Sequence, residues 1–179
     1  ASKINPDNEW YSLSLSDAFQ RNRQYQESIE ILNKLIKSHP EKIEYYNKSA
    51  MLYILYGKYN DAINVYNILE SKIGINEEIS LQKQKIFLEM NKIYKAIDEI
   101  HKLINKFPTE VKYYEILAEL YMLNKDEQNA FNTYNKILEI DKYNSSVHLS
   151  LASYYRNKGQ KEKSFEQLKI AFSNEGLNI

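Results

Sequence analysis

The chain has no cysteine, and it has few of the residues that interrupt helices, with three prolines and four glycines in 179 residues. Without cysteine there is neither a disulfide framework nor thiolate chemistry. No apolar run approaches the roughly 18 residues that a membrane-spanning helix needs, so the sequence predicts no membrane span. Acidic and basic side chains number 24 each and leave a net charge of zero. That balance argues against a dedicated surface for nucleic acid or anionic membranes.

The prolines and glycines that are present follow a period of 34 residues. They occupy two phases of that period, the first with Pro6, Pro40, Gly74, Pro108 and Gly176, and the second with Gly57 and Gly159. Proline and glycine are unfavourable inside helices and mark where helices end. Their spacing therefore predicts helices and turns that recur every 34 residues.

Small and large side chains alternate at fixed positions of this period when each copy is numbered from Glu9, Ile43, Glu77, Val111 and Ser145. Position 8 reads Ser16, Ala50, Gln84, Ala118 and Ala152, and position 20 reads Ser28, Ala62, Ala96, Ala130 and Ser164. Small residues at both positions predict that the two helices of a copy approach closely. Positions 21, 24 and 27 are aromatic or aliphatic in nearly every copy, and their helical spacing predicts one apolar stripe.

This pattern resembles the tetratricopeptide repeat, which has the same 34-residue period. The resemblance implies an all-α fold, a right-handed α-solenoid of antiparallel helix pairs. It covers five tandem copies at residues 9–42, 43–76, 77–110, 111–144 and 145–178, after a closing turn of a preceding repeat at 1–8. We expect the chain to be a fragment of a longer array. The third copy should be the least regular, because Lys83 and Gln84 stand where leucine and a small residue are expected.

Each copy is expected to contain two helices joined by a short turn. The predicted ranges are 9–22, 25–38, 43–56, 59–72, 77–90, 93–106, 111–124, 127–140, 145–158 and 161–173. The first helix of each copy begins near position 1, and the second begins near position 17.

No catalytic arrangement emerges from the sequence. His39, His101 and His148 lie far apart and in different phases, so we interpret them as surface or rim histidines and not as metal ligands. Carboxylates four residues apart, such as Glu115 and Glu119, are typical of a solvated helix face. There is no glycine-rich phosphate loop and no nucleophile elbow. The sequence predicts no enzymatic activity, no cofactor and no metal site.

In the tetratricopeptide family, the first helix of each copy lines a concave groove that holds a segment of another protein. The resemblance implies that this groove is lined here by Asp17, Asn47, Lys48, Met51, Leu81, Gln82, Lys85, Leu88, Lys112, Glu115, Glu119, Leu149, Ser153 and Arg156. Met122, Ser150 and Asn157 occupy further positions of the same wall. The wall mixes apolar side chains with both signs of charge, as peptide-binding surfaces do. Its apolar members are equally expected to pad neighbouring repeats.

The leading functional hypothesis is a non-catalytic scaffold that binds another protein or a peptide segment. A chaperone-tail adaptor is not expected, because no three consecutive copies supply the convergent cations that grip a C-terminal carboxylate. RNA binding is disfavoured by the strict 34-residue spacing and the neutral charge. The alternative is a structural spacer array within a larger protein, whose ends self-associate end to end.

Overall fold

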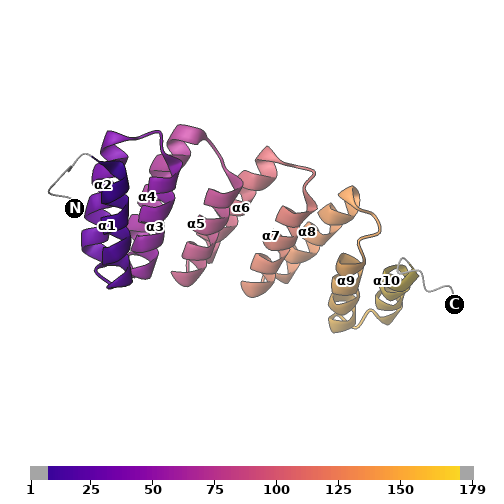
Figure 1. Ribbon diagram of the computed structural model, residues 1–179. Helices are drawn as coiled ribbons and strands as arrows, with labels where there is room; N and C mark the ends of the chain where they lie inside the picture. The colour runs from indigo at the N-terminus through magenta and orange to yellow at the C-terminus, as the bar shows by residue number, and fades with distance from the viewer. Residues whose placement is uncertain (1–7, 174–179) are drawn as a thin grey trace. The chain divides into compact units, whose positions relative to one another are not determined.

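The computed structural model describes residues 8–173, and the chain divides into two compact units, unit 1 (Ala1–Asn91) and unit 2 (Lys92–Ile179). Unit 1 contains α1 (Glu9–Arg21), α2 (Tyr25–Ser38), α3 (Ile43–Leu55), α4 (Tyr59–Ile73) and α5 (Glu77–Glu89). Unit 2 contains α6 (Ile93–Lys106), α7 (Val111–Leu123), α8 (Glu127–Ile140), α9 (Ser145–Asn157) and α10 (Lys161–Ser173) (Figure 1). Apart from Asn8, the closing turn expected at 1–8 lies outside the described residues, and so does Gly176.

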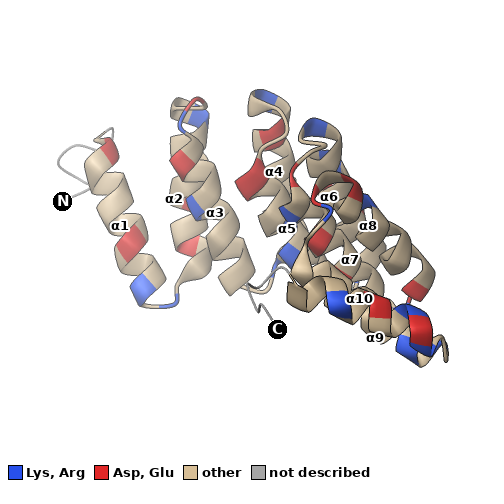
Figure 2. Cartoon of the chain, turned by 90° about the vertical axis from the view of Figure 1, so that its right-hand side faces the viewer, with Lys and Arg blue, Asp and Glu red and all other residues tan. Residues whose placement is uncertain are grey.

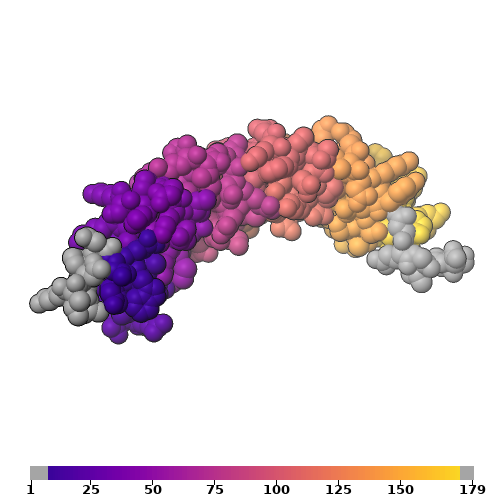
Figure 3. All heavy atoms as spheres, turned by 45° about the horizontal axis from the view of Figure 1, so that its top comes forward, coloured from indigo at the N-terminus to yellow at the C-terminus, as the bar shows by residue number. Residues whose placement is uncertain are grey.

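Every helix begins at its predicted residue and ends within one residue of its predicted end. The expected fold class is confirmed as an all-α helical repeat fold. Within each unit, helices that follow one another in the chain lie side by side (Figure 1). The all-atom view shows segments that are close in sequence as neighbouring colours within each unit (Figure 3). We call the odd-numbered helices A helices and the even-numbered ones B helices. The unit boundary falls between α5 and α6, which the sequence assigns to one copy.

The turn after each A helix uses a left-handed residue at position 15 of the repeat. The residues there are Arg23 (φ 59°), Gly57 (75°), Asn91 (55°), Lys125 (58°) and Gly159 (75°). In the turn at Gly57, the Gly57 N–H donates to the Ile54 carbonyl and the Lys58 N–H donates to the Tyr53 carbonyl, at 2.9 and 2.8 Å. This is the Schellman pattern of a helix end. It explains why one phase of the period contains glycines.

Replacing Gly57 with alanine should lower the free energy of unfolding by about 1 kcal/mol, because a Cβ disfavours the left-handed region. A Cβ built on Gly57 meets no atom within 4 Å, so the cost is conformational and not steric. Lys125→Gly at the same position of another repeat should act in the opposite sense, by about 0.5 kcal/mol. Chemical denaturation of both variants tests this pair, and a loss of stability in Lys125→Gly would contradict it.

Small side chains let the A and B helices of a pair approach closely, as predicted. The Ser28 hydroxyl donates to the Ser16 carbonyl oxygen across the α1–α2 contact, at 2.8 Å. In the last pair, the Ser164 hydroxyl donates to the Ala152 carbonyl oxygen at the same distance. A hydroxyl can reach the backbone of the neighbouring helix only where the two helices nearly touch. In the second and fourth pairs, alanines fill these positions and are fully buried.

The apolar core of each unit joins a B helix to the A helix that follows it. In unit 1, Ile29, Leu32 and Leu35 of α2 cluster with Tyr45 and Leu52 of α3. In unit 2, Ile137 of α8 clusters with Val147 and Leu151 of α9. The stripe predicted at positions 21, 24 and 27 therefore serves to stack successive pairs.

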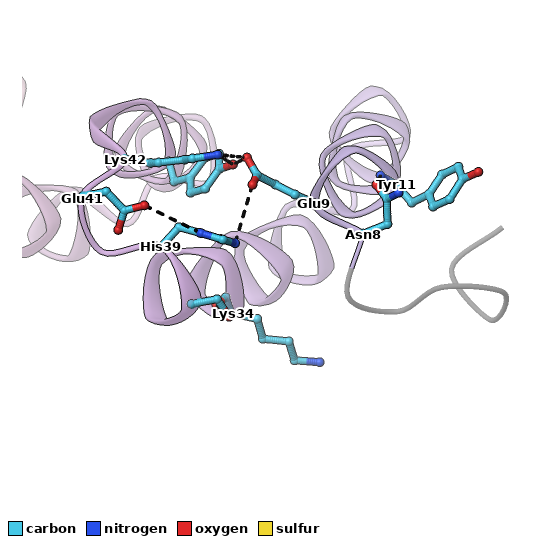
Figure 4. Close-up of polar contacts among 9 residues, drawn as sticks. Asn8, Glu9, Tyr11, Lys34, His39, Glu41 and Lys42 are labelled. Atoms are coloured by element: carbon cyan, nitrogen blue, oxygen red, sulfur yellow. Dashed lines mark hydrogen bonds and ion pairs between the residues drawn. The ribbon is translucent and has the colours of Figure 1, made fainter.

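A polar cluster around Glu9 ties α1 to the start of α3 (Figure 4). The Glu9 carboxylate accepts hydrogen bonds from the Lys42 ammonium and the Tyr45 hydroxyl. His39 Nε2 lies 3.6 Å from Glu9 Oε2, and His39 Nδ1 lies 3.8 Å from Glu41 Oε1. The hydrogen bond to Glu9 raises the pKa of Lys42. The cluster thus links the first helix pair to the second through charge as well as apolar contact.

Lys83 and His148 are among the buried polar side chains. Lys83 of α5 is 2% exposed, and its Nζ lies 3.0 Å from Glu70 Oε2 of α4. His148 of α9 is 4% exposed, so its interpretation as a surface or rim histidine is wrong. Its Nε2 contacts the Lys142 carbonyl oxygen at 3.0 Å, and its Nδ1 lies 2.6 Å from the Gln167 side-chain amide. These contacts explain how a histidine is accommodated in the core.

Candidate peptide-binding surface

The residues predicted to line a groove all lie on A helices, and none of them is buried. We call them together the A-helix face. In unit 1 they are Asp17 on α1, Asn47, Lys48 and Met51 on α3, and Leu81, Gln82, Lys85 and Leu88 on α5. In unit 2 they are Lys112, Glu115 and Glu119 on α7, and Leu149, Ser153 and Arg156 on α9. Each unit therefore presents its own accessible part of this face.

In unit 1, the A-helix face combines an ion pair with exposed apolar side chains. Lys48 of α3 pairs with Asp17 of α1, which places equivalent surfaces of two neighbouring A helices together. Met51 of α3 is 50% exposed and Trp10 of α1 is 68% exposed. Leu81 and Leu88 on α5 are partly buried. The most accessible apolar anchor among the predicted residues of unit 1 is thus Met51.

In unit 2, a small cavity adjoins this face at Ser153, and we call it the α7–α9 pocket. Its volume is about 180 Å³, and it is lined by Met122 of α7, Glu127 and Tyr134 of α8, and Ser150, Ser153, Tyr154 and Asn157 of α9. Ser153 belongs to the predicted groove, and Met122, Ser150 and Asn157 belong to the same wall. Lys112, Glu115, Glu119, Leu149 and Arg156 are not among the lining residues.

The rim of this pocket contains an ion pair over an aromatic ring. Lys158 Nζ lies 2.8 Å from Glu127 Oε2 and 5.5 Å from the centroid of the Tyr154 ring. The hydrogen bond to Glu127 raises the pKa of Lys158, so this lysine is charged at neutral pH. The Tyr154 ring in turn stacks on Phe131 with centroids 4.7 Å apart, which fixes its orientation. The rim therefore has both a carboxylate and an aromatic face, as cation recognition requires.

Within residues 8–173, no group of three histidine, cysteine or acidic side chains is placed to hold a metal ion. His101, which the sequence left as a rim histidine, is partly exposed and lies 3.4 Å from the Tyr121 hydroxyl. None of the described helices has the length and apolar character to cross a membrane. Basic and acidic side chains are interspersed on the helices of both units (Figure 2).

Comparison with known proteins identifies the repeats. The tetratricopeptide repeat family matches at residues 12–42 and again at residues 111–144. The chain contains tetratricopeptide repeats. Among curated proteins, none matches it in sequence.

Solved tetratricopeptide repeat proteins resemble the chain in fold. MamA is 20% identical with a TM-score of 0.62, and the match covers 89% of this chain and 94% of MamA. MamA 41-end from Desulfovibrio magneticus RS-1 is 15% identical with a TM-score of 0.59, and covers 97% and 98%. YrrB, described as a TPR protein with an unusual peptide-binding site, is 10% identical with a TM-score of 0.56, and covers 96% and 89%. At these identities the likeness concerns the fold alone.

Tetratricopeptide repeats serve in general as scaffolds for protein–protein interaction, and the fold of the chain supports that general role. The repeat pattern alone missed three residues of the α7–α9 pocket, Glu127, Tyr134 and Tyr154. Tyr154 occupies position 10, where three other copies have Leu52, Ile86 and Leu120. A tyrosine at a position that is aliphatic in those three copies could have indicated that the fifth repeat has a different surface there. Glu127 and Tyr134 lie on a B helix, which the groove pattern of the family does not include.

Proposed function

We propose that the chain is a non-catalytic adaptor that holds a peptide segment of another protein on its A-helix face. The observation that carries this proposal is the α7–α9 pocket, a side-chain-sized cavity on the surface where the repeat pattern expects a partner. Peptide recognition uses such pockets to hold single side chains between polar contacts. The likeness in fold to YrrB, itself described as having a peptide-binding site, supports the same reading.

The apolar anchors of this adaptor are Met51 in unit 1 and Leu149 in unit 2, which are 50% and 42% exposed. Apolar side chains that are exposed in the free protein contribute to binding when a partner covers them and removes them from water. Because both are already accessible, charged substitutions there test binding with little effect on folding. Leu81 and Leu88 are less suitable, since they are partly buried.

Partner recovery should fall by about fivefold or more when Met51→Glu and Leu149→Glu are combined, because each removes an apolar anchor and adds a charge. The measurement is affinity capture from a lysate of the source cells, with quantitative mass spectrometry. Ile68→Glu is the matched control, because Ile68 is 51% exposed but lies on α4, a B helix. A partner recovered equally by all baits would contradict the A-helix face as its binding site.

A second candidate is end-to-end assembly of copies of the chain. On α10, Phe165 and Phe172 are 60% and 51% exposed and are two helical turns apart, so they form an apolar stripe. The equivalent residues of α2 are Ile29, a member of the core shared with α3, and Ile36, which packs against that core. Light scattering over a range of concentrations distinguishes the two functions, because a mass that rises with concentration favours assembly.

A further inference from the structure

The rim of the α7–α9 pocket already binds a cation, the ammonium of the chain's own Lys158. The Lys158 Nζ contacts the Glu127 carboxylate at 2.8 Å and lies 5.5 Å from the Tyr154 ring centroid. The Lys158 and Glu127 side chains are 46% and 50% exposed. An ion pair this accessible to water contributes little to stability, so a competing cation can replace Lys158 at low cost.

The lining of the pocket supplies hydrogen-bond acceptors next to apolar surface. Glu127 alone carries a charge among the lining residues that the structure describes. The Ser150 hydroxyl donates its proton to the Ser146 carbonyl at 3.1 Å, which leaves the Ser150 oxygen as an acceptor. Ser153 and Asn157 add further oxygens on the same helix, and Met122 adds an apolar wall. Such a lining suits a long side chain with an apolar stem and several donors at its tip.

Charges on the neighbouring A-helix faces of unit 2 are mixed. Glu115 and Glu119 on α7 are one helical turn apart from each other, and Glu119 is three residues before Met122. Lys112 lies 4.9 Å from the Tyr113 ring centroid, at the opposite end of α7 from Met122. On α9, Arg156 is exposed and lies between Ser153 and Asn157 in the sequence. Within the pocket itself, α7 contributes the apolar Met122, α8 contributes the Glu127 carboxylate, and α9 contributes hydroxyl and amide groups and the Tyr154 ring.

We infer that the α7–α9 pocket recognises an arginine side chain of the bound peptide, which takes the place of Lys158 on Glu127 and Tyr154. This inference rests on the proposed adaptor function. A guanidinium group can make two parallel hydrogen bonds to the Glu127 carboxylate and stack on the Tyr154 ring, whereas a lysine ammonium is a point charge. Its remaining N–H groups match the oxygens of Ser150 and Asn157.

The test is an NMR titration of the folded chain with the probe acetyl-Ala-Arg-Ala-amide, followed at the amides of Ser150, Ser153 and Asn157. Glu127→Gln should raise the Kd by about fivefold or more, because it removes the charge that pairs with the guanidinium. Lys158→Gln should lower the Kd by about two- to threefold, because the competing ammonium is gone. Glu139→Gln is the matched control, since Glu139 is an exposed, lysine-paired carboxylate on the same helix, and it should leave the Kd unchanged.

The same tripeptide with glutamate in place of arginine should not shift these amides, and the lysine version should bind more weakly than the arginine version. Three results would each overturn the arginine assignment. They are the absence of shifts at the three amides at millimolar concentrations of the arginine probe, equal binding of the glutamate probe, and an unchanged Kd in Glu127→Gln. If the Met51 and Leu149 substitutions still abolish partner capture in that case, only the arginine assignment fails and the adaptor proposal stands. If the probe binds but capture is insensitive to those substitutions, the pocket assignment stands and the adaptor proposal fails.

Discussion

Replacing Lys83 with alanine is expected to lower the free energy of unfolding by about 3 to 5 kcal/mol. The Lys83 side chain is 2% exposed, and its ammonium lies 3.0 Å from the Glu70 carboxylate, which is itself 16% exposed. Removing one member of a buried ion pair leaves the other charge poorly solvated and deprived of that contact. The truncation also leaves a cavity where the lysine stem packed.

Urea denaturation of the variant measures this loss, and Lys85→Ala provides the control on the same helix. Lys85 is exposed, so its truncation should change stability by no more than about 0.5 kcal/mol. A double-mutant cycle with Glu70→Ala isolates the pair, because the Glu70 change should cost less once Lys83 is gone. Equal costs of Glu70→Ala in both backgrounds would show that the two charges do not stabilise each other.

Most of the fold follows from the placement of a few residue types. The glycines and prolines mark the turns, and the small residues at positions 8 and 20 mark where paired helices touch. Helix ends were predictable to within one residue because each turn repeats the same backbone geometry. Arg23 and Lys125 adopt the same left-handed geometry although they are not glycine. Only their place in the 34-residue period indicates that a turn occurs there.

The Lys83–Glu70 ion pair joins two neighbouring copies, so it cannot be predicted from the residues of one copy alone. Lys83 at position 7 was recognised as a departure, but Glu70 at position 28 of the preceding copy is a departure too. In the other copies position 28 is Ile36, Ile104, Leu138 and Phe172. Two charged residues of opposite sign at positions that meet between neighbouring copies predict an ion pair. The partner was therefore present in the sequence, one repeat earlier.

The candidate site was less predictable than the fold for a physical reason. The repeat pattern assigns residues to faces of helices, but a pocket also depends on side chains from the B helix beneath and on how aromatic rings stack. Tyr154 lines the α7–α9 pocket because it stacks on Phe131 of the preceding helix. Glu127 reaches the rim from the first turn of α8. Neither position is part of the family's groove pattern.

Truncation of Ile137 to alanine is expected to cost about 2 to 5 kcal/mol, because Ile137 is fully buried at the α8–α9 contact. Val147 and Leu151 of α9 cluster with it. Both neighbours lie on a helix and not on a flexible loop, so they cannot move far enough to fill the space that the truncation leaves. Ile140→Ala on the same helix is the control. Its side chain is 39% exposed, so its truncation should cost about 1 kcal/mol or less.

Amide hydrogen exchange tests this prediction segment by segment, which matters because repeat arrays need not unfold as one cooperative unit. Each repeat is stabilised mainly by its neighbours, so Ile137→Ala should remove protection chiefly from α8, α9 and α10. Protection in α1 and α2 should persist, because their core with Tyr45 and Leu52 shares no residue with the Ile137 cluster. An equal loss of protection in α1 and α2 would mean that the chain unfolds in a single step, and that stability is shared across all its helices.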